Sequence, residues 1–347
     1  MSTDNKRRLF TSGFTIVELL IVIVVIGVLA AITIISYIGV TARANITSLT
    51  SDLSSSSQQL KLYQTLYGSY PKSLDLSNCP SGPADTTYCL KPSKGTAYQY
   101  LVSNNTDPQT FCIAATKGTY TYKITNDNAP SLGNCIDFGL VLNLDAGTAA
   151  SYSGSGTTWT DLSGNNNNGT LVNSVGYTAS NGGALVFNGL NNYVNVPGNI
   201  TLEPKSITVS AWIKMSTGAP TTRNIFLTKW NGYSCEIEDT TRRPYFRLAG
   251  AGDVYSTDNL VLGNWYQFVG TFEKGVGSKI YLNGALKGSI SSSSDILYSV
   301  NSVLNIGRYA GGVYFDGLIS DVRIYSRPLD IAEIIQNYDA LKRRYGL

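Results

Sequence analysis

The sequence predicts two folded parts in series. The first is an α+β part with a long N-terminal α-helix and a small antiparallel sheet, and the second is an all-β jelly-roll sandwich. Three observations predict this: a charge-free apolar run near the N-terminus, four closely spaced cysteines, and apolar–polar alternation throughout the second half. At 347 residues the chain is long enough for more than one domain.

The amino-acid composition excludes or disfavours several classes of function. Charged residues make up only 14% of the chain, and Gly, Ser, Thr, Asn and Tyr are abundant, which is typical of an exported, β-rich surface protein. The net charge of +3 is small and scattered, so no nucleic-acid partner is expected. Since the chain has no histidine, His-based zinc sites, Ser-His-Asp triads and Cys-His dyads are excluded.

Four of the five cysteines lie in the middle of the chain, at Cys79, Cys89, Cys112 and Cys135. No CxxC pair exists, so structural zinc is disfavoured, and an exported segment of this kind predicts two disulfides. Three connectivities are open, of which we favour the local pairing Cys79–Cys89 and Cys112–Cys135. Each closed loop stabilises the fold by roughly 3 kcal/mol. Cys235 is left over, and we expect it to be a buried strand thiol.

The N-terminal segment combines a basic leader with a long apolar run. Residues 6–8 are basic, and residues 19–42 contain no charge, which corresponds to roughly 36 Å of helix and spans a bilayer with the N-terminus inside. A cleaved secretory signal has a shorter apolar core. A plain membrane anchor accounts for the length but leaves Glu18 unexplained, because a carboxylate near a membrane needs a partner.

The stretch GFTIVE at residues 13–18, after the short leader, resembles the class III signal of type IV pilins and pseudopilins. The resemblance implies that a prepilin peptidase cuts after Gly13 and methylates the new N-terminal residue, Phe14. It also implies that Glu18 of one subunit neutralises the new amine of a neighbouring subunit during assembly. A buried amine is tolerated when a carboxylate pairs with it. Glu18 lies in the first turn of its helix, where the helix dipole favours a negative charge.

Past the apolar run the helix continues, and the next segment forms a small sheet. Residues 51–59 are polar and are expected on the solvent face of the helix. Short strands are predicted in residues 98–102, 111–115 and 119–124, which resemble the sheet of a pilin head. The residues expected on the buried face of the helix are Ile46, Leu49, Leu53, Leu60, Tyr63 and Tyr67.

From Gly139 onwards, period-two alternation is frequent. It is clear at residues 207–213, and Asn283-Gly284 predicts a tight hairpin. About a dozen short strands predict a sandwich or jelly roll, and residues 329–345 predict an amphipathic helix that closes it. Further strands are predicted at 184–187, 193–196, 225–228, 233–237, 245–249, 265–272, 279–282, 303–307 and 318–325.

Several motifs of this part resemble laminin-G-like, concanavalin A-like sandwich domains. They occur in order at residues 139–147, 159–171, 185–189, 280–284 and 315–325. We therefore expect four parts: a leader peptide (1–13), a transmembrane and assembly helix (14–42), a disulfide-containing pilin head (43–136, hereafter the head) and a laminin-G-like sandwich (137–347, hereafter the sandwich).

Fold alone does not decide between binding and catalysis. Glu236 and Glu238 lie on one face of a predicted strand, and paired carboxylates about 5–5.5 Å apart are what a retaining glycosidase uses. Related glucanases carry a Glu-x-Asp-x-x-Glu run, whose third carboxylate is missing here. We interpret the pair as a solvated strand face and expect no enzyme.

Calcium is weakly supported, and no cofactor is expected. Relatives hold calcium with acidic side chains near a loop rim, but residues 188–192 offer amides instead. We expect Asp145, Asp161 and Asp316 to cap turns through backbone hydrogen bonds.

These observations predict a type IV pilus subunit that displays a lectin-like domain for adhesion to glycans or to another cell. The resemblance implies a prepilin peptidase and other pilin subunits as partners. It also implies insertion in the cytoplasmic membrane before assembly and a place in an extracellular pilus afterwards. Two alternatives remain open: a structural pseudopilin of a type II secretion or DNA-uptake machine, and a tethered glycan hydrolase.

Overall fold

The computed structural model describes residues 16–81, 86–104, 108–126, 128–218, 224–309 and 311–347, without the side chains of residues 18 and 31–39. The expected leader peptide, with Gly13, and the expected methylation site, Phe14, lie outside the described residues. Glu18 lies in the first helix, but its side chain is also outside the description.

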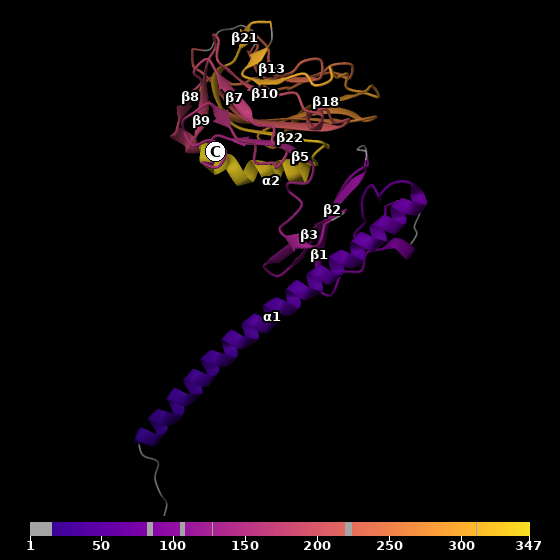
Figure 1. Cartoon of the computed structure of the whole chain (residues 1–347), viewed down its shortest axis with the longest axis vertical. Helices are drawn as coiled ribbons and strands as arrows, with labels where there is room; N and C mark the ends of the chain where they lie inside the picture. Colours follow the sequence, from indigo (N-terminus) through magenta and orange to yellow (C-terminus); the bar gives the residue numbers. More distant parts are fainter. Residues whose placement is uncertain (1–15, 82–85, 105–107, 127, 219–223, 310) are drawn as a thin grey trace, which may run out of the picture.

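A single helix of 52 residues, α1 (Ile16–Tyr67), runs from the N-terminal end of the described chain to the far side of the head (Figure 1). Its second half packs on a four-stranded antiparallel sheet through Leu49, Leu53 and Leu60, which are buried with Phe111 and Ile113. The head contains η1 (Thr86–Tyr88) and the strands β1 (Ala97–Ser103), β2 (Thr110–Lys117), β3 (Tyr120–Thr125) and β4 (Ser131–Leu132) in the order β1-β2-β3-β4.

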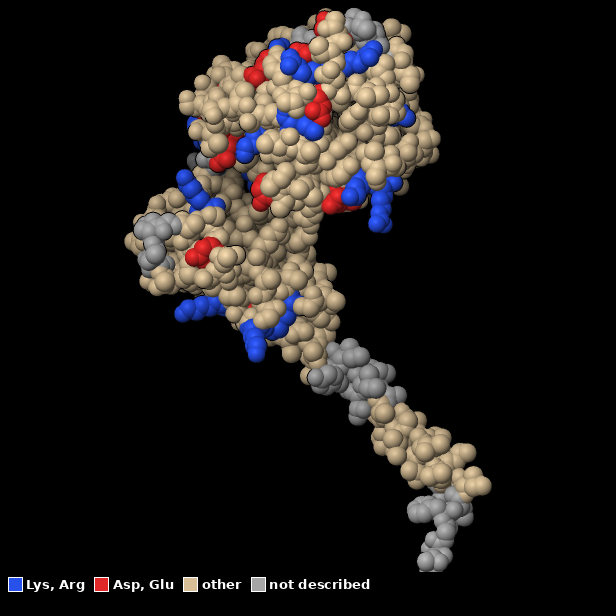
Figure 2. Space-filling view, turned by 180° about the vertical axis from the view of Figure 1, so that it is seen from behind, with Lys and Arg blue, Asp and Glu red and all other residues tan. Residues whose placement is uncertain are grey.

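The first half of α1 presents apolar side chains to its surroundings. Its side chains from Leu19 to Leu29 are exposed, and they belong to the thin lower part of the molecule in Figure 2. Among the described residues, no helix is long and apolar enough to cross a membrane.

The expectation that residues 51–59 face solvent is wrong for three of them. Asp52, Ser56 and Ser57 are buried. Asp52 accepts hydrogen bonds from the backbone amide and the hydroxyl of Ser93, at 2.9 and 2.8 Å, and Ser56 donates to the hydroxyl of Tyr98 at 3.0 Å. Burial of a polar group requires such partners, and here they come from chain segments about 40 residues away.

Two disulfides close the head. Cys79 pairs with Cys89 and Cys112 pairs with Cys135, which is the local connectivity that we favoured among the three. The second bridge ties strand β2 to the segment that leads into the sandwich. Cys235 is a free, buried thiol on strand β13, as expected.

The sandwich consists of two packed antiparallel sheets with one hydrophobic core between them, which confirms the predicted jelly-roll class. We call the first the open sheet. Its strands, in spatial order, are β15 (Gly252–Tyr255), β14 (Pro244–Leu248), β13 (Tyr233–Ile237), β12 (Asn224–Lys229), β19 (Leu304–Ile306), β10 (Tyr193–Val196), β7 (Gly169–Val172) and β6 (Thr158–Trp159).

We call the second the covered sheet. Its strands, in spatial order, are β18 (Ala285–Ser291), β17 (Gly277–Leu282), β16 (Trp265–Glu273), β11 (Ile207–Met215), β22 (Asp316–Tyr325), β9 (Ala184–Asn188) and β8 (Gly176–Thr178), and β5 (Leu140–Asp145) also pairs with β22. A short hairpin, β20 (Arg308–Tyr309) and β21 (Val313–Tyr314), and the turns η2 (Ser180–Gly182) and η3 (Ile200–Leu202) complete this part.

Local sequence explains much of this topology. Asn283 and Gly284 form the turn between β17 and β18 with positive φ angles of 50° and 79°, as the predicted hairpin requires. Along β11, Val209, Ala211 and Ile213 enter the core between the sheets, and Trp212 points to the other face.

The C-terminal helix covers the outer face of the covered sheet, as predicted. It consists of α2 (Ile331–Leu341) followed by η4 (Lys342–Tyr345), and a capping box between Asp330 and Glu333 begins it. The rings of Trp212 and Tyr345 stack with centroids 4.1 Å apart, and Ile334 is buried against the same sheet. α2 therefore packs on the covered sheet, while the outer face of the open sheet is covered in part by the short β20–β21 hairpin.

Arg327 connects the sandwich to the segment that leads from the head. Its side chain is buried, forms two hydrogen bonds to the Glu333 carboxylate at 2.8 and 2.6 Å, and donates to the Phe138 carbonyl at 2.8 Å. Its guanidinium also lies over the Phe138 ring, 5.3 Å from the centroid. That ring packs against the buried Cys112–Cys135 bridge, so Phe138 touches both parts of the molecule.

We predict that Arg327→Met destabilises the sandwich by about 3–5 kcal/mol, because it leaves the Glu333 carboxylate buried without its ion pair. Adding Glu333→Gln, which keeps a side chain able to complete the capping box, should recover part of the loss. All four Trp lie in the sandwich, so Trp fluorescence in urea measures its unfolding. Arg243→Met is the matched control: its exposed pair with Glu238 should contribute only about 0–1 kcal/mol. Equal losses in Arg327→Met and Arg243→Met would contradict the prediction.

We also predict that alkaline pH destabilises the fold. Burial raises the pKa of Tyr100, Tyr233 and Tyr298 above the usual 10.0 and raises the pKa of Tyr98 to about 12. Above pH 10 these groups keep their protons in the folded state and lose them in the unfolded state. Their stabilising effect is therefore complete below pH 10 and is lost as the pH rises, by about 1.4 kcal/mol per pH unit for each group.

Urea denaturation followed by circular dichroism between pH 8 and pH 12 measures this effect. Lys229, whose pKa is lowered by burial, acts in the opposite direction, but only below the usual lysine pKa of 10.5. An unfolding free energy that stays constant from pH 10 to pH 12 would contradict the prediction.

Candidate binding site

The outer face of the open sheet carries polar side chains. Along β13, Tyr233 and Cys235 enter the core between the sheets, so Ser234 and Glu236 point to the outer face by the alternation of a strand. In Figure 1 the open sheet, with β13 and β10, lies on the side of the sandwich away from the head, and α2 lies on the side that faces it.

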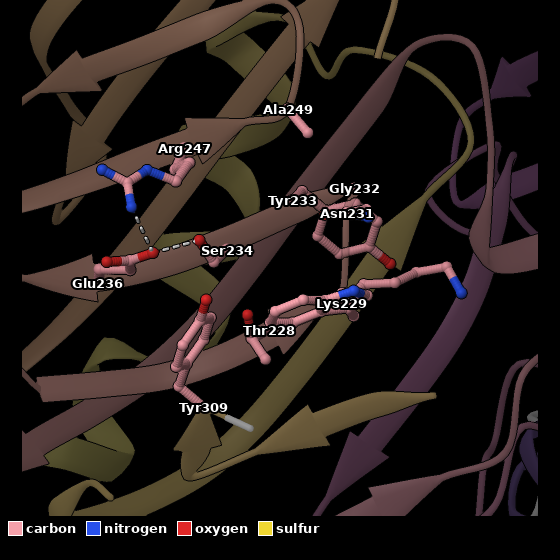
Figure 3. Close-up of a pocket in the computed structure, with 11 residues that line it drawn as sticks. Thr228, Lys229, Asn231, Gly232, Tyr233, Ser234, Glu236, Arg247, Ala249 and Tyr309 are labelled. Atoms are coloured by element: carbon pink, nitrogen blue, oxygen red, sulfur yellow. Dashed lines mark hydrogen bonds and ion pairs between the residues drawn. The ribbon is translucent and has the colours of Figure 1, made fainter. Parts of the chain in front are cut away.

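A cavity of about 110 Å³ opens on this face. It is formed by β12, the turn from β12 to β13, the strands β13 and β14, and one residue of the β20–β21 hairpin (Figure 3). The residues that line it are Thr228, Lys229, Trp230, Asn231, Gly232, Tyr233, Ser234, Glu236, Arg247, Ala249 and Tyr309.

Glu236 forms the charged floor of the cavity. It is 0% exposed, and its carboxylate accepts hydrogen bonds from the hydroxyls of Ser234 and Tyr245. The Arg247 guanidinium lies 3.8 Å from the same carboxylate and forms a closer pair with Asp253 at 2.9 Å. Burying a carboxylate is tolerated because hydroxyls and a cation surround it.

Aromatic side chains form part of the rim. Trp230 is 42% exposed, although a large apolar ring is ordinarily buried. Its ring lies beside that of Tyr309, with centroids 5.6 Å apart and planes at 40°. In Figure 3 the Tyr309 hydroxyl points toward the side of the cavity that holds Ser234 and Glu236. The cavity therefore combines an apolar surface with oriented hydrogen-bonding groups.

The turn that carries Trp230 is held by a neighbouring loop. Asn231 adopts a left-handed φ of 45°, which Asn tolerates better than most residues, and its amide donates to the Ser299 hydroxyl at 3.0 Å. The Ser302 hydroxyl donates to the Trp230 carbonyl at 3.0 Å. A β-carbon on Gly232 would lie 2.9 Å from the Tyr298 ring, so this position leaves room only for glycine.

A buried ion pair also holds the β12–β13 turn and the loop before β19 together. Lys229 is fully buried, lies 3.1 Å from the Glu203 carboxylate and donates to the Ser302 carbonyl at 2.6 Å. Burial lowers the pKa of Lys229, and the nearby Glu203 carboxylate opposes this shift. The pair joins the end of β12 to the residue that follows η3, and the hydrogen bond to Ser302 joins it to the segment before β19, so Lys229 orients the turn that carries Trp230.

The two glutamates considered for catalysis are held in separate environments. The expectation of a solvated strand face is wrong for Glu236, which is buried. Glu238 follows the end of β13 and binds Arg243 through both carboxylate oxygens, at 3.0 and 2.9 Å. This contact lowers the pKa of Glu238. A glycosidase needs one carboxyl group that donates a proton, and an ionised Glu238 does not supply it.

Two of the three carboxylates considered for calcium accept backbone amides. Asp145 accepts from the Gly147 amide at 2.9 Å and also pairs with Arg344 at 2.7 Å, and Asp161 accepts backbone amides at both of its oxygens. Asn188 accepts amides of its own turn. Asp316 begins β22, and its capping role stays a prediction. Among the described residues, no group of three or more His, Cys, Asp or Glu is placed to hold a metal ion.

Sequence reasoning singled out Glu236 but missed the residues around it. The signal for Ser234, Tyr245 and Arg247 was present, because alternation in β13 and β14 places them on the same face as Glu236. Trp230 was also detectable as a tryptophan between two predicted strands. Tyr309 was not, because its hairpin is short and its partner Trp230 is distant in sequence.

The C-terminal part of the chain is similar in sequence and in fold to known proteins. Residues 187–335 match the family described as the concanavalin A-like lectin/glucanases superfamily. Among solved structures, domain 4 of the extracellular GH43 arabinanase AbnA from Geobacillus stearothermophilus, in complex with arabinotriose, gives a TM-score of 0.46 at 19% identity. That alignment covers 57% of this chain and 97% of the arabinanase domain.

A second solved structure is the binding domain of botulinum neurotoxin DC in complex with SialylT. It gives a TM-score of 0.47 at 16% identity, and the alignment covers 59% of this chain and 52% of the toxin chain.

The N-terminal part matches a curated protein. The type IV wide pilus major component PilA4 of Thermus thermophilus is 31% identical over 111 residues, which are 31% of this chain and 85% of PilA4. The long helix, the small antiparallel sheet and the two disulfides of the head agree with the resemblance in the N-terminal sequence. The chain belongs to the type IV pilin family, and its C-terminal part is a β-sandwich that matches the concanavalin A-like lectin/glucanases superfamily over residues 187–335.

Proposed function

We propose that this pilin acts in adhesion and uses its lectin-type domain to bind glycans on another surface. One observation carries the proposal: the outer face of the open sheet, which the β20–β21 hairpin covers only in part, contains the cavity beside Glu236 and lies on the side of the sandwich away from the head (Figure 1). A cavity with an aromatic rim and a few fixed polar groups suits binding of a small ligand. The pilin part would place this face at a distance from the cell.

The proposal includes processing and assembly through the N-terminus. A prepilin peptidase would cut after Gly13 and methylate Phe14. Residues 19–42, which contain no charge, would hold the chain in the cytoplasmic membrane before assembly. In the filament, the exposed apolar side chains of the first half of α1 would pack against other pilin subunits.

Adhesion should depend on the sandwich. We expect cells whose chain ends at residue 136, which keeps both disulfides of the head, to form pili but to adhere to glycan-coated surfaces about tenfold less than cells with the full chain. Counting attached cells, with pilus number checked by electron microscopy, measures this. Undiminished adhesion would contradict the proposal. Loss of secretion or DNA uptake with unchanged adhesion would favour the pseudopilin alternative.

Assembly should depend on Glu18. We expect Glu18→Ala to be inserted and processed normally but to give few filaments, because the new amine at Phe14 of a neighbouring subunit would be buried without its counter-charge. Immunoblots of sheared pili and of whole cells separate assembly from processing. Val17→Ala, the neighbouring position, is the matched control. A normal filament yield from Glu18→Ala would refute this role.

A further inference from the structure

The charges around the cavity are already paired. Arg247 contacts Asp253 through both Nε and Nη2, at 3.1 and 2.9 Å, and lies against Glu236. Lys229 contacts Glu203 at 3.1 Å. Each cation that lines the cavity therefore already has a carboxylate partner, and the buried carboxylate of Glu236 already has a cation beside it.

This balance disfavours a charged ligand of either sign. A ligand carboxylate would approach Glu236, which is 0% exposed, and would gain little from a guanidinium already paired with Asp253. A ligand ammonium would approach Arg247. Since unpaired charges in a site shielded from water are costly, the electrostatics favour a neutral ligand that forms many hydrogen bonds.

The two sides of the cavity differ in a way that fits one chemical class. Trp230 and Tyr309 supply an apolar surface. Arg247 and Asn231 supply N–H donors, and the Ser234 hydroxyl, whose proton is donated to Glu236, supplies an acceptor (Figure 3). A pyranose ring has a face of C–H groups and an edge of hydroxyls that both donate and accept. The cavity of about 110 Å³ has room for the edge of one ring and not for a buried oligosaccharide.

We propose that this cavity binds the terminal residue of a neutral glycan, a hexose or N-acetylhexosamine, with the sugar face on Trp230 and its hydroxyls on Arg247 and Asn231. This inference rests on the proposed adhesive function and specifies its ligand. The loop contacts of Asn231 and the Lys229–Glu203 pair hold the binding surface in place before the ligand arrives, which lowers the entropy lost on binding.

Sheared pili carrying the full-length chain, applied to an array of immobilised neutral, sialylated and uronic-acid glycans, test this. We expect binding to neutral terminal sugars and a loss of about tenfold for Trp230→Ala. The matched control is Tyr67→Ala, which removes an aromatic residue of similar exposure, 45% against 42%, from the head. It should bind as the wild type does.

A second variant tests the charge argument without touching the aromatic rim. Asp253→Asn removes the closer partner of Arg247, and Asp253 lies at the surface with its side chain 26% exposed. We expect this variant to gain binding to sialylated or uronic-acid glycans about tenfold over the wild type. An unchanged preference between neutral and acidic glycans would overturn the charge argument.

The outcomes separate this inference from the proposed function. Wild-type pili that bind acidic glycans more strongly than neutral ones, or Trp230→Ala pili that bind as the wild type does, would overturn the inference and leave adhesion in place. Wild-type pili that bind no glycan on the array would overturn both.

Discussion

The buried contact between Arg327 and Glu333 is the interaction on which the arrangement of the molecule depends. Arg327 reaches the Phe138 carbonyl in the segment from the head, and Glu333 belongs to the first turn of α2. Arg327 and Glu333 therefore hold α2 on the covered sheet and also attach the sandwich to the segment that leads from the head. Because α2 packs on the outer face of the covered sheet, it covers the central strands of that face and leaves a cavity beside its first turn, over β16 and β17. No helix covers the outer face of the open sheet in the described residues, although the β20–β21 hairpin packs on β12, and this face points away from the head (Figure 1).

A related constraint governs the cavity. Burying Glu236 has a desolvation cost that the hydroxyls of Ser234 and Tyr245 and the guanidinium of Arg247 offset. These contacts also fix the carboxylate in one orientation. The buried carboxylate in turn holds Ser234 and Arg247 in position before a ligand arrives, which lowers the entropy lost on binding.

The sequence predicted features that depend on local pattern. The alternation in β11, the turn at Asn283 and Gly284, and the amphipathic α2 all follow from residues close together in the chain, and the N-terminal signal is local too. Contacts that depend on folding were missed. Asp52 was expected in solvent because its partner Ser93 is 41 residues away. Half of the rim of the cavity was missed for the same reason, since Trp230 meets Tyr309 only when the hairpin folds over the sheet.

The connection between head and sandwich shows how a pull on the sandwich would reach the helix. The chain passes from the sandwich through Phe138 to Cys135, and the next strand toward the N-terminus is β4, a two-residue edge strand. Such a strand has few backbone hydrogen bonds and would separate easily. The disulfide from Cys135 to Cys112 carries the force past β4 to β2, which pairs on both sides with β1 and β3. Since β2 also packs on the buried face of α1 through Phe111 and Ile113, force on the sandwich passes through a covalent bond into the best-packed strand of the head. A domain that binds a surface under tension requires a connection of this kind.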